Sequence, residues 1–521
     1  MRTTGVIAAS EPHTAAAGAA LLRQGGTAVD AIVAAKLAAC VTEAPLTSLG
    51  GGGACVFGSA SVGYRVLDFF ATTPGLGLTA RPQLDFSPMT VDFGPTQQTY
   101  HLGKASVAVP GELVGLLALH RAGGRLPLRD VVAPAARLAT EGFAVSPQIA
   151  MIIGMLGPIA RTTPEVARAF FPVGVDRNPV PGDRLSNPAL GALLTALGDG
   201  SPDAIVARYW ADLAAHFGPS QGGLITPADG AAYAPVFREP LRVRFGDHTV
   251  LTNPPPSAGG GLIGAGLRIA DGLGLGAEPF QSAAHLQSVA AVLAAVSDIR
   301  ASGYDARLHS DPDAIRALVA GDGSAAWVQR ARQIRDERSL GGTTHISVID
   351  GEGFAASMTT SNGEGCGHAL PGTGIHLNNF LGEEDINPDG FHQFAPGTRM
   401  STMMSPTIVT AGDAPRFVLG TGGSNRIRSA VLQALLNLLA YRRPLDEAVN
   451  AARLHIEGRK LWFEDVDLAA GAGEALRAQW PDAARFADYS MFFGGVHSVA
   501  TDGVAVWGAG DRRRGGVVVA T

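Results

Sequence analysis

Residues 341–350 read Gly-Gly-Thr-Thr-His-Ile-Ser-Val-Ile-Asp, two glycines followed by a segment with the pattern of a β-strand. A chain cut between Gly342 and Thr343 would begin with Thr343 and would carry a nucleophile and a base in one residue. The hydroxyl could attack a carbonyl carbon while the freed α-amine accepts its proton. An unperturbed α-amine has a pKa of about 7.7–8.0, close to the pH at which a general base works best. The same ten residues also fit a glycine turn that opens an ordinary strand.

The composition is that of a large folded protein without a strong charge imbalance. The chain has 521 residues, of which 46% are hydrophobic and 17% are charged, and its formal net charge is −6. This length allows roughly two to four domains. The 40 lysines and arginines are spread along the chain, which argues against a nucleic-acid-binding surface. Residues 512–514, Arg-Arg-Arg, would be a short surface patch near the C-terminus in most proteins.

The cysteines and the apolar segments give expectations about cofactors and location. Cys40, Cys55 and Cys366 show neither a CxxC pair nor zinc-ligand spacing, so no metal and no organic cofactor is expected. Three sparse cysteines fit a reducing compartment or buried thiols, although Cys366, in a glycine-rich loop, is a candidate catalytic residue. The first ten residues contain no apolar signal core, and no run of 18 apolar residues appears. We therefore expect a cytoplasmic protein without a membrane span.

The apolar spacing up to residue 342 predicts mostly helices. Residues 11–44 have a helical period that Gly25-Gly26 interrupts, which predicts two helices. Strands are expected at 54–57, after a run of four glycines, and at 62–70, where the pattern alternates. The stretch 105–340 is expected to be mostly helical. Its helices are expected near residues 111–122, 129–140, 187–197, 203–217, 258–272, 281–299 and 312–320.

Beyond Gly342 the pattern changes to strands. These strands are expected at residues 344–350, 354–360, 374–379, 406–411, 416–420, 494–500 and 503–507. Helices are expected at about 425–441 and 445–453. Strand pairs on both sides of the 342/343 boundary, with helices outside them, predict stacked sheets covered by helices. We find no internal repeat and no linker that would separate independent domains.

A hairpin is predicted where Gly-Glu-Gly separates the two strands that follow Thr343. If Asp350 pairs with Gly353 across a two-residue turn, Thr343 lies opposite Thr360, with Asn362 two residues further along on the same face. Thr360 could then hydrogen-bond the Thr343 hydroxyl, and Asn362 could orient the amine or a substrate. A register shift of one residue would remove this alignment.

Two further segments could contribute to a site. The strand at 416–420 is followed by Thr-Gly-Gly-Ser and then by a helix, so Gly422 and Gly423 could present N–H groups to an anion. Such a loop serves as an oxyanion hole or a phosphate cradle, but the lysine of a Walker loop is absent, and a plain tight turn also fits. Residues 397–407 combine hydroxyls and an arginine with three methionines, which fits a polar pocket wall or a proline-terminated loop.

Taken together and in order, these segments resemble the γ-glutamyltranspeptidase family, a branch of the N-terminal-nucleophile hydrolases. Single motifs are weak, but a run of them in the family's order is specific. The resemblance extends over nearly the whole chain, at residues 9–13, 25–31, 50–53, 109–111, 253–257, 343–345, 378–379, 404–407 and 422–423.

The resemblance implies an α+β fold, a four-layer αββα sandwich of the N-terminal-nucleophile hydrolase type. It also implies self-cleavage before Thr343 into a large fragment, 1–342, and a small catalytic fragment, 343–521, which stay associated as one intertwined unit. Thr343 is then the nucleophile, with Gly422 and Gly423 as oxyanion donors. The supporting polar pair is Thr360 and Asn362, and the hydroxyls for a substrate carboxylate are those of Ser401 and Thr402.

Two departures from the family pattern concern the substrate. Typical members have Arg-Glu after Asp-Phe, and that arginine binds the α-carboxylate of the γ-glutamyl group, whereas this chain has Phe70 in its place. A phenyl ring cannot form a bidentate charged pair, and loss of such a buried contact costs about 2–5 kcal/mol. Typical members also follow Asn-Asn with acidic residues that hold the substrate ammonium. Here Asn379 is followed by Phe380, and carboxylates such as Glu383 persist but are shifted.

The family chemistry with an altered substrate is therefore our interpretation of the sequence. We expect a self-processing hydrolase that attacks a carbonyl of a small acyl or oxalyl-type substrate, by amide or C–C bond cleavage. Relatives with such departures include amidohydrolases and proteins of antibiotic biosynthesis. One alternative is a conventional γ-glutamyl transferase or glutathione hydrolase. A second is a non-processing pseudoenzyme kept as a scaffold, against which the intact Thr343 site argues.

Overall fold

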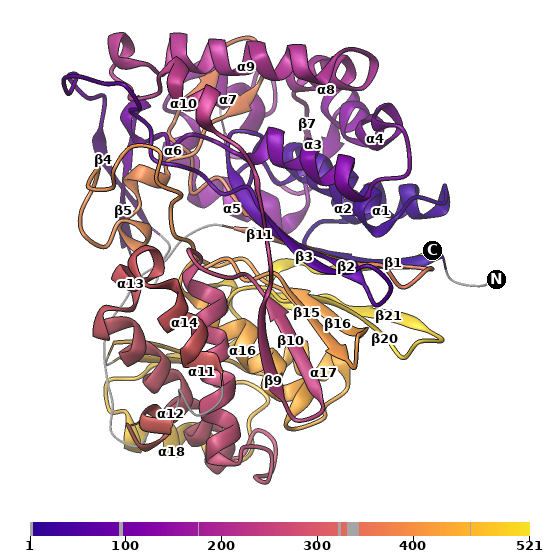
Figure 1. Cartoon of the computed structure of the whole chain (residues 1–521), viewed down its shortest axis with the longest axis vertical. Helices are drawn as coiled ribbons and strands as arrows, with labels where there is room; N and C mark the ends of the chain where they lie inside the picture. The colour runs from indigo at the N-terminus through magenta and orange to yellow at the C-terminus, as the bar shows by residue number, and fades with distance from the viewer. Residues whose placement is uncertain (1–3, 93–96, 176, 321–324, 331–342, 459) are drawn as a thin grey trace.

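The computed structural model describes residues 4–92, 97–175, 177–320, 325–330, 343–458 and 460–521. Two antiparallel sheets lie face to face at the centre of the fold (Figure 1). The larger sheet has the strand order β22-β1-β11-β12-β2-β3-β8. Its strands are β1 (Gly5–Ala9), β2 (Gly52–Ser59), β3 (Gly63–Asp68), β8 (Val236–Arg238), β11 (Thr344–Asp350), β12 (Ala355–Ser361) and β22 (Val517–Ala520).

The second sheet has the strand order β21-β20-β16-β15-β10-β9. Its strands are β9 (Leu241–Phe245), β10 (His248–Thr252), β15 (Thr407–Ala411), β16 (Ala414–Gly420), β20 (His497–Thr501) and β21 (Val506–Ala509). The two sheets meet through a layer of buried aliphatic side chains, among them Val6, Val56, Ile349, Val418 and Val499. β11 and β12 are buried on both faces, because the second sheet covers one face and helices cover the other.

Helices cover the outer face of the larger sheet, with α2 packed directly on β11 and β12. Every residue of α2 is buried. The predicted break at Gly25-Gly26 is confirmed, because the first helix ends at Arg23 and the second begins after a capping box between Thr27 and Asp30. The helices of this part are α1 (Pro12–Arg23), α2 (Ala28–Thr42), α3 (Glu112–Gly123), α4 (Leu128–Glu141), α5 (Pro147–Met155), α6 (Gly157–Ala160), α7 (Pro164–Phe170), α8 (Pro188–Asp199), α9 (Pro202–His216) and α10 (Pro227–Ala232).

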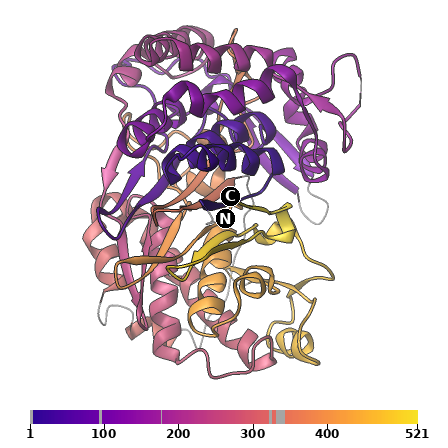
Figure 2. The ribbon, with the colours of Figure 1, turned by 90° about the vertical axis from the view of Figure 1, so that its right-hand side faces the viewer.

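A second group of helices lies on the opposite side of the molecule, beyond the second sheet (Figure 2). Its helix α11 packs against β9, α12 and α16. The helices of this group are α11 (Ala258–Leu273), α12 (Ala283–Ile299), α13 (Asp305–Ser310), α14 (Pro312–Val319), α15 (Ala325–Arg330), α16 (Arg426–Leu439), α17 (Leu445–Asn450) and α18 (Ala472–Gln479). Among the described residues, no helix is both long and apolar enough to cross a lipid bilayer.

Short strand pairs complete the fold outside the two sheets. They are β4 (Ser87–Asp92) with β5 (Gln97–Leu102), β6 (Phe143–Ala144) with β7 (Arg184–Leu185), β13 (Ala369–Leu370) with β14 (Ile375–His376), and the group β17 (Leu454–Glu457), β18 (Lys460–Glu464) and β19 (Ala484–Phe486). The strand expected at 374–379 is thus reduced to Ile375–His376. β8, β9 and β10 lie inside the stretch that was expected to be mostly helical.

The turn between β11 and β12 is one residue longer than expected. Asp350 and Phe354 are joined by a hydrogen bond from Asp350 N to Phe354 O at 3.0 Å, so the loop contains three residues. The carboxylate of Asp350 stabilises this loop, because its Oδ1 accepts hydrogen bonds from the N–H groups of Glu352 and Phe354. The predicted pairing of Asp350 with Gly353 is therefore wrong.

The longer turn shifts the hairpin register by one residue. Thr360 pairs with Thr344 and not with Thr343. Continuation of the observed register places Ser361 across from Thr343. Side chains alternate between the two faces of a strand. The shift therefore places Ser361, and not Thr360, on the same face of the sheet as Thr343.

Candidate active site

Thr343 directly precedes β11, and 4% of its surface is exposed. Its carbonyl oxygen accepts a hydrogen bond from Nη1 of Arg514 at 2.9 Å. Gly422 lies against the same oxygen so closely that a Cβ atom at position 422 would be 1.8 Å from it, which only glycine avoids. The expected cleavage point is the bond between Gly342 and Thr343, and Gly342 lies outside the described residues.

Thr343 and Ser361 both line a cavity of about 330 Å³. The cavity lies where the end of β12 meets the loops before β15, helix α13 and the start of α16. Four of the five residues expected to bind substrate line it as well, namely Phe70, Glu383, Ser401 and Thr402. A pocket of this size accommodates a small organic molecule.

One wall of the cavity is apolar. The ring of Phe70 is 2% exposed and lies 4.7 Å from the ring of Phe380, measured between centroids. Both belong to a buried cluster that also contains Met400 and Met404. A charged substrate group placed against this wall would lose its hydration without gaining a partner, which is unfavourable. The wall therefore suits an apolar or neutral part of a ligand.

The nearby guanidinium of Arg399 does not replace the missing arginine. It donates hydrogen bonds to the carbonyl oxygen of Phe70, to the Tyr233 hydroxyl and to the carbonyl oxygen of Ala234. It also lies over the Tyr233 ring, 4.8 Å from its centroid. Arg399 is not among the residues that line the cavity.

Several polar residues that were not expected from the sequence also line the cavity, among them Arg300 and His309. Arg300 donates hydrogen bonds to Asp305 at 2.9 Å and to Asn425 at 2.7 Å. His309, on α13, has its Nε2 atom 3.2 Å from the Ser401 hydroxyl, and burial lowers the pKa of His309 below its usual value. No local motif marks Arg300 or His309, since tertiary packing alone brings them to the cavity.

Comparison with known proteins places this fold and cavity in a family. The model of the gamma-glutamyltranspeptidase family matches residues 14–521. The chain belongs to the γ-glutamyltranspeptidase family. It is 31% identical to the Acylase ACY 1 proenzyme of Pseudomonas sp. (strain SE83), over 97% of this chain and 92% of that protein. It is 29% identical to the glutathione hydrolase proenzyme of Pseudomonas aeruginosa, over 98% and 94% of the two chains.

The fold is shared with a solved acylase structure. The crystal structure of cephalosporin acylase from Bacillus halodurans superposes with a TM-score of 0.81, covers 99% of this chain and 96% of that one, and is 21% identical. The resemblance to the γ-glutamyltranspeptidase family is thus confirmed, and the chain is a hydrolase or transferase of the N-terminal-nucleophile type.

Glu383 places a buried carboxyl group in the lining of the cavity. Burial, followed by the nearby charges of Asp385 and Glu364, raises the pKa of Glu383 well above its usual value and so favours the neutral carboxyl form. Within the described residues its Oε1 atom has no hydrogen-bond partner. A neutral carboxylic acid can donate a hydrogen bond to a ligand, but it cannot balance the charge of an ammonium group.

Five residues of the expected site do not line the cavity, namely Thr360, Asn362, Asn379, Gly422 and Gly423, and Gly422 lines a smaller cavity that also borders Thr343. The Thr360 hydroxyl lies 3.1 Å from that of Thr47, and Asn362 donates to the carbonyl oxygen of Leu377 at 3.4 Å. The Asn379 side-chain oxygen accepts hydrogen bonds from the backbone N–H groups of residues 364 and 365. The role of Thr360 and Asn362 as a supporting pair stays a prediction, while Ser361 is the hydroxyl that the cavity shares with Thr343.

Thr343 also lines a smaller cavity, of about 10 Å³. It reaches Glu43, whose carboxylate accepts hydrogen bonds from Thr344 at 2.7 Å, from Thr14 at 2.8 Å and from Ser10. This volume is close to that of one water molecule, and the lining offers several polar partners. Thr343 therefore borders both a ligand-sized cavity and a water-sized one.

Cys366 does not have the surroundings of a nucleophile. It is buried outside both cavities that border Thr343, and burial raises the pKa of its thiol to about 12. The thiolate is the reactive form of cysteine, and it is scarce at neutral pH under these conditions.

Proposed function

We propose that this protein is a self-processing acylase in which Thr343 attacks the carbonyl carbon of a small acyl donor without an amino-acid head group. The observation that carries the proposal is the position of Phe70 in the wall of the cavity that Thr343 borders. The two stacked sheets with helices outside them support the four-layer αββα arrangement of the N-terminal-nucleophile type.

Self-processing precedes turnover in this proposal. The Thr343 hydroxyl attacks the carbonyl carbon of Gly342, the peptide C–N bond breaks, and the amine of Thr343 is released as an ester forms. Water then hydrolyses the ester and leaves the fragments 1–342 and 343–521. The names of the two relatives, both proenzymes, support this order of events.

Turnover uses the same hydroxyl and the new amine. The amine accepts the hydroxyl proton while Thr343 Oγ1 bonds to the acyl carbon, and the amine later returns the proton to the leaving group. Gly422, which lies against Thr343, and the next residue, Gly423, precede α16 and are the proposed donors to the oxyanion. Water hydrolyses the acyl ester. An oxalyl-type ketone would be attacked in the same way, with a C–C bond as the one that breaks.

The cavity supports a head group other than that of a γ-glutamyl compound. The Phe70 wall offers no charge to a carboxylate, and the raised pKa of Glu383 makes it a weak partner for an ammonium group. Arg300 and Asp305 also line the cavity, but their charges are paired with each other. Ser401 and Thr402 remain as hydroxyls for a polar group of the acyl chain. The relative named Acylase ACY 1 proenzyme also supports the acylase proposal. Similarity to the Pseudomonas aeruginosa glutathione hydrolase proenzyme keeps γ-glutamyl hydrolysis as the second candidate.

Three p-nitroanilides that differ only in the head group test the substrate. γ-Glutamyl-p-nitroanilide has both the carboxylate and the amine, the glutaryl compound lacks the amine, and the butyryl compound lacks both. We expect kcat/KM to rise at least tenfold from the γ-glutamyl to the butyryl compound, because an unpaired buried charge is costly. An oxalyl-type substrate is assayed in parallel. Brisk γ-glutamyl release would overturn the altered specificity.

Denaturing electrophoresis with N-terminal sequencing tests the processing. We expect a fragment that begins with Thr343, and we expect Thr343→Ala to remove both cleavage and turnover. Cys366→Ala is the matched control and should retain both, because its thiol is buried away from the cavity. Cleavage in Thr343→Ala would place the nucleophile elsewhere, and a single uncleaved, inactive chain of wild type would support the scaffold alternative.

A further inference from the structure

Arg513 and Arg514 are buried, although residues 512–514 were expected to form a surface patch. Each of the two is 4% exposed, and they belong to a short turn between β21 and β22. That expectation is therefore wrong for two of the three arginines. Buried charges persist in proteins only when they are paired or hydrogen-bonded, so the partners of these arginines matter.

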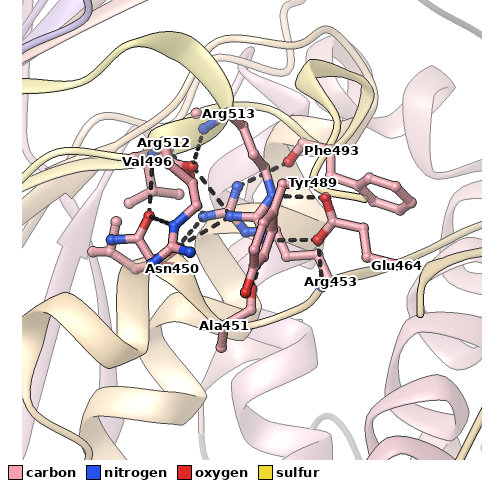
Figure 3. Close-up of polar contacts among 12 residues, drawn as sticks. Asn450, Ala451, Arg453, Glu464, Tyr489, Phe493, Val496, Arg512 and Arg513 are labelled. Carbon is pink, nitrogen blue, oxygen red and sulfur yellow. Dashed lines mark hydrogen bonds and ion pairs between the residues drawn. The ribbon is translucent and has the colours of Figure 1, made fainter. Parts of the chain in front are cut away.

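A buried ion cluster fixes this turn in place (Figure 3). The Arg513 guanidinium contacts the carboxylates of Glu464 and Asp511, and Arg453 contacts Asp511 at 2.6 Å. The Asp511 carboxylate also accepts hydrogen bonds from the N–H groups of Val496 and Arg513. These bonds hold the backbone of the turn from several directions and so determine where the next side chain, Arg514, begins.

From this turn Arg514 extends to Thr343. Its Nη1 atom donates to the Thr343 carbonyl oxygen at 2.9 Å. Two close approaches define its path. A Cβ atom at Gly495 would lie 2.6 Å from Cβ and Cγ of Arg514, and a Cβ atom at Gly422 would lie 3.0 Å from Nη1. The Arg514 side chain thus passes between the backbone at Gly422 and the backbone at Gly495, where there is no room for a side chain.

We propose that Arg514 is a positioning residue that fixes the main chain of Thr343 for self-cleavage and for turnover. The inference rests on the proposed function, since it needs Thr343 to be the nucleophile. The carbonyl group that Arg514 holds belongs to the same residue as the hydroxyl and the future amine. Rotation of that peptide group would move both reacting atoms, and small displacements of reacting atoms are costly to rate.

The position of Arg514 also has an electrostatic consequence. The nitrogen atom that becomes the amine is two bonds from the carbonyl carbon whose oxygen Arg514 binds, so a permanent cation lies close to it. A nearby like charge disfavours the ammonium form and lowers the amine pKa, which keeps the base uncharged at lower pH. Arg514 provides this field constantly, because a guanidinium stays protonated in proteins.

Other titratable groups around Thr343 act on the same amine. His345 and His497 are neutral at pH 7, because burial lowers the pKa of each. Burial raises the pKa of Glu383 and so favours its neutral form. The charged and titratable groups that line the two cavities bordering Thr343, or that act on Arg514, are Glu43, Arg300, Asp305, His309, His345, Glu364, Glu383, Asp385, Asp389, His497, Asp511 and Arg514.

Two substitutions of Arg514 distinguish its effect on the position of Thr343 from the effect of its charge on the amine. Arg514→Gln removes the charge, and we expect self-cleavage to slow by about tenfold or more. We also expect the acidic limb of the kcat/KM profile to move up by roughly 0.5–1 pH unit. Arg514→Lys keeps the charge with a shorter reach, and should slow cleavage while the acidic limb stays in place. Arg512→Gln is the control, because Arg512 lies in the same turn and bonds to Asn450 instead.

The outcomes distinguish this inference from the proposed function. A purely structural role would lower the melting temperature and the activity equally at every pH, without moving the acidic limb. If the wild-type protein is cleaved before Thr343 and both Arg514 variants show the same cleavage rate and pH profile as wild type, the inference is overturned. If wild type yields no fragment that begins with Thr343, the proposed function fails first. Should Arg514→Gln not fold, cleavage by Arg514→Lys at the wild-type rate would itself overturn the inference.

Discussion

The hydroxyl groups of Thr360 and Thr47 lie 3.1 Å apart, in the layer between β12 and the end of α2. Thr344, the strand partner of Thr360, bonds to Glu43 in the same layer. Ser361 follows Thr360 and lines the cavity instead. The hairpin register thus assigns the two neighbouring hydroxyls to different surroundings, although the sequence pattern alone does not distinguish them.

This difference predicts opposite effects of two substitutions. Ser361→Ala should lower kcat by about tenfold or more, because a hydroxyl beside the nucleophile is lost, with little change in stability. Thr360→Val should retain most of kcat but lower the unfolding free energy by about 1 kcal/mol, because the Thr47 hydroxyl loses a partner. Steady-state kinetics and thermal denaturation of both variants check this. A larger kcat loss in Thr360→Val would return the supporting role to Thr360.

Phe70 should control the length of acyl chain that the cavity accepts. Phe70→Leu removes ring contacts with Phe380 and enlarges the cavity. The ratio of kcat/KM for hexanoyl-p-nitroanilide to that for butyryl-p-nitroanilide should therefore rise several-fold. Phe463→Leu is a matched control, because Phe463 is equally buried but belongs to the core of the second helical group. That variant should lose stability without a change in the ratio. An unchanged ratio in Phe70→Leu would show that Phe70 does not determine which acyl chain is accepted.

Glu11 should make stability depend on pH. Its carboxylate caps α1 through Thr14 N at 2.9 Å, and burial, assisted by the charge of Glu43, raises the pKa of Glu11 from 4.5 to about 7. Because the folded pKa is the higher one, this contribution to stability is complete below about pH 4.5 and is lost as pH rises through 7. The amount is roughly 3 kcal/mol. Glu11→Gln keeps the cap and should flatten the difference in melting temperature between pH 4.5 and 7.5.

Lys36 and Glu112 should stabilise the fold only as a pair. Their charged atoms are 3.5 Å apart, both side chains are 0% exposed, and Lys36 also contacts the Cys40 sulfur at 2.9 Å. Lys36→Met leaves a buried carboxyl group without its partner and should cost about 3–5 kcal/mol. The double change Lys36→Met/Glu112→Leu should recover most of this loss. Denaturant titration of the single and double variants measures the difference, and additive losses would contradict the pairing.

The sequence predicted the elements whose signals are local. The helices on either side of Gly25-Gly26 follow from apolar spacing and the glycine break, and β11 and β12 follow from their strand pattern and flanking glycines. The register failed because it depends on one extra turn residue, which the Asp350 carboxylate stabilises. β9 alternates between buried and exposed residues, yet the helical segments around it obscured this signal.

The site was predictable only where family motifs mark it. Thr343, Phe70, Ser401 and Thr402 reach the same cavity, as expected for parts of one site. Arg300 carries no local signal and reaches the cavity through the packing of helices distant in sequence. Arg513 and Arg514 were misjudged because three consecutive arginines usually face solvent, whereas here Arg513 pairs with Glu464 and Asp511 and Arg514 bonds to the Thr343 carbonyl oxygen. Such pairings depend on the completed fold.

β1, from the beginning of the chain, lies between β11 and β22, which both come from residues 343–521. Backbone hydrogen bonds therefore join a strand of the proposed large fragment to the proposed small fragment along both edges. Once the chain is cut, β1 could leave only if both ladders broke together, which amounts to unfolding the sheet. The lifetime of the two-fragment enzyme would then be set by an unfolding rate and not by a Kd. Inactivation on storage should accordingly be first-order in time, and dilution should not accelerate it.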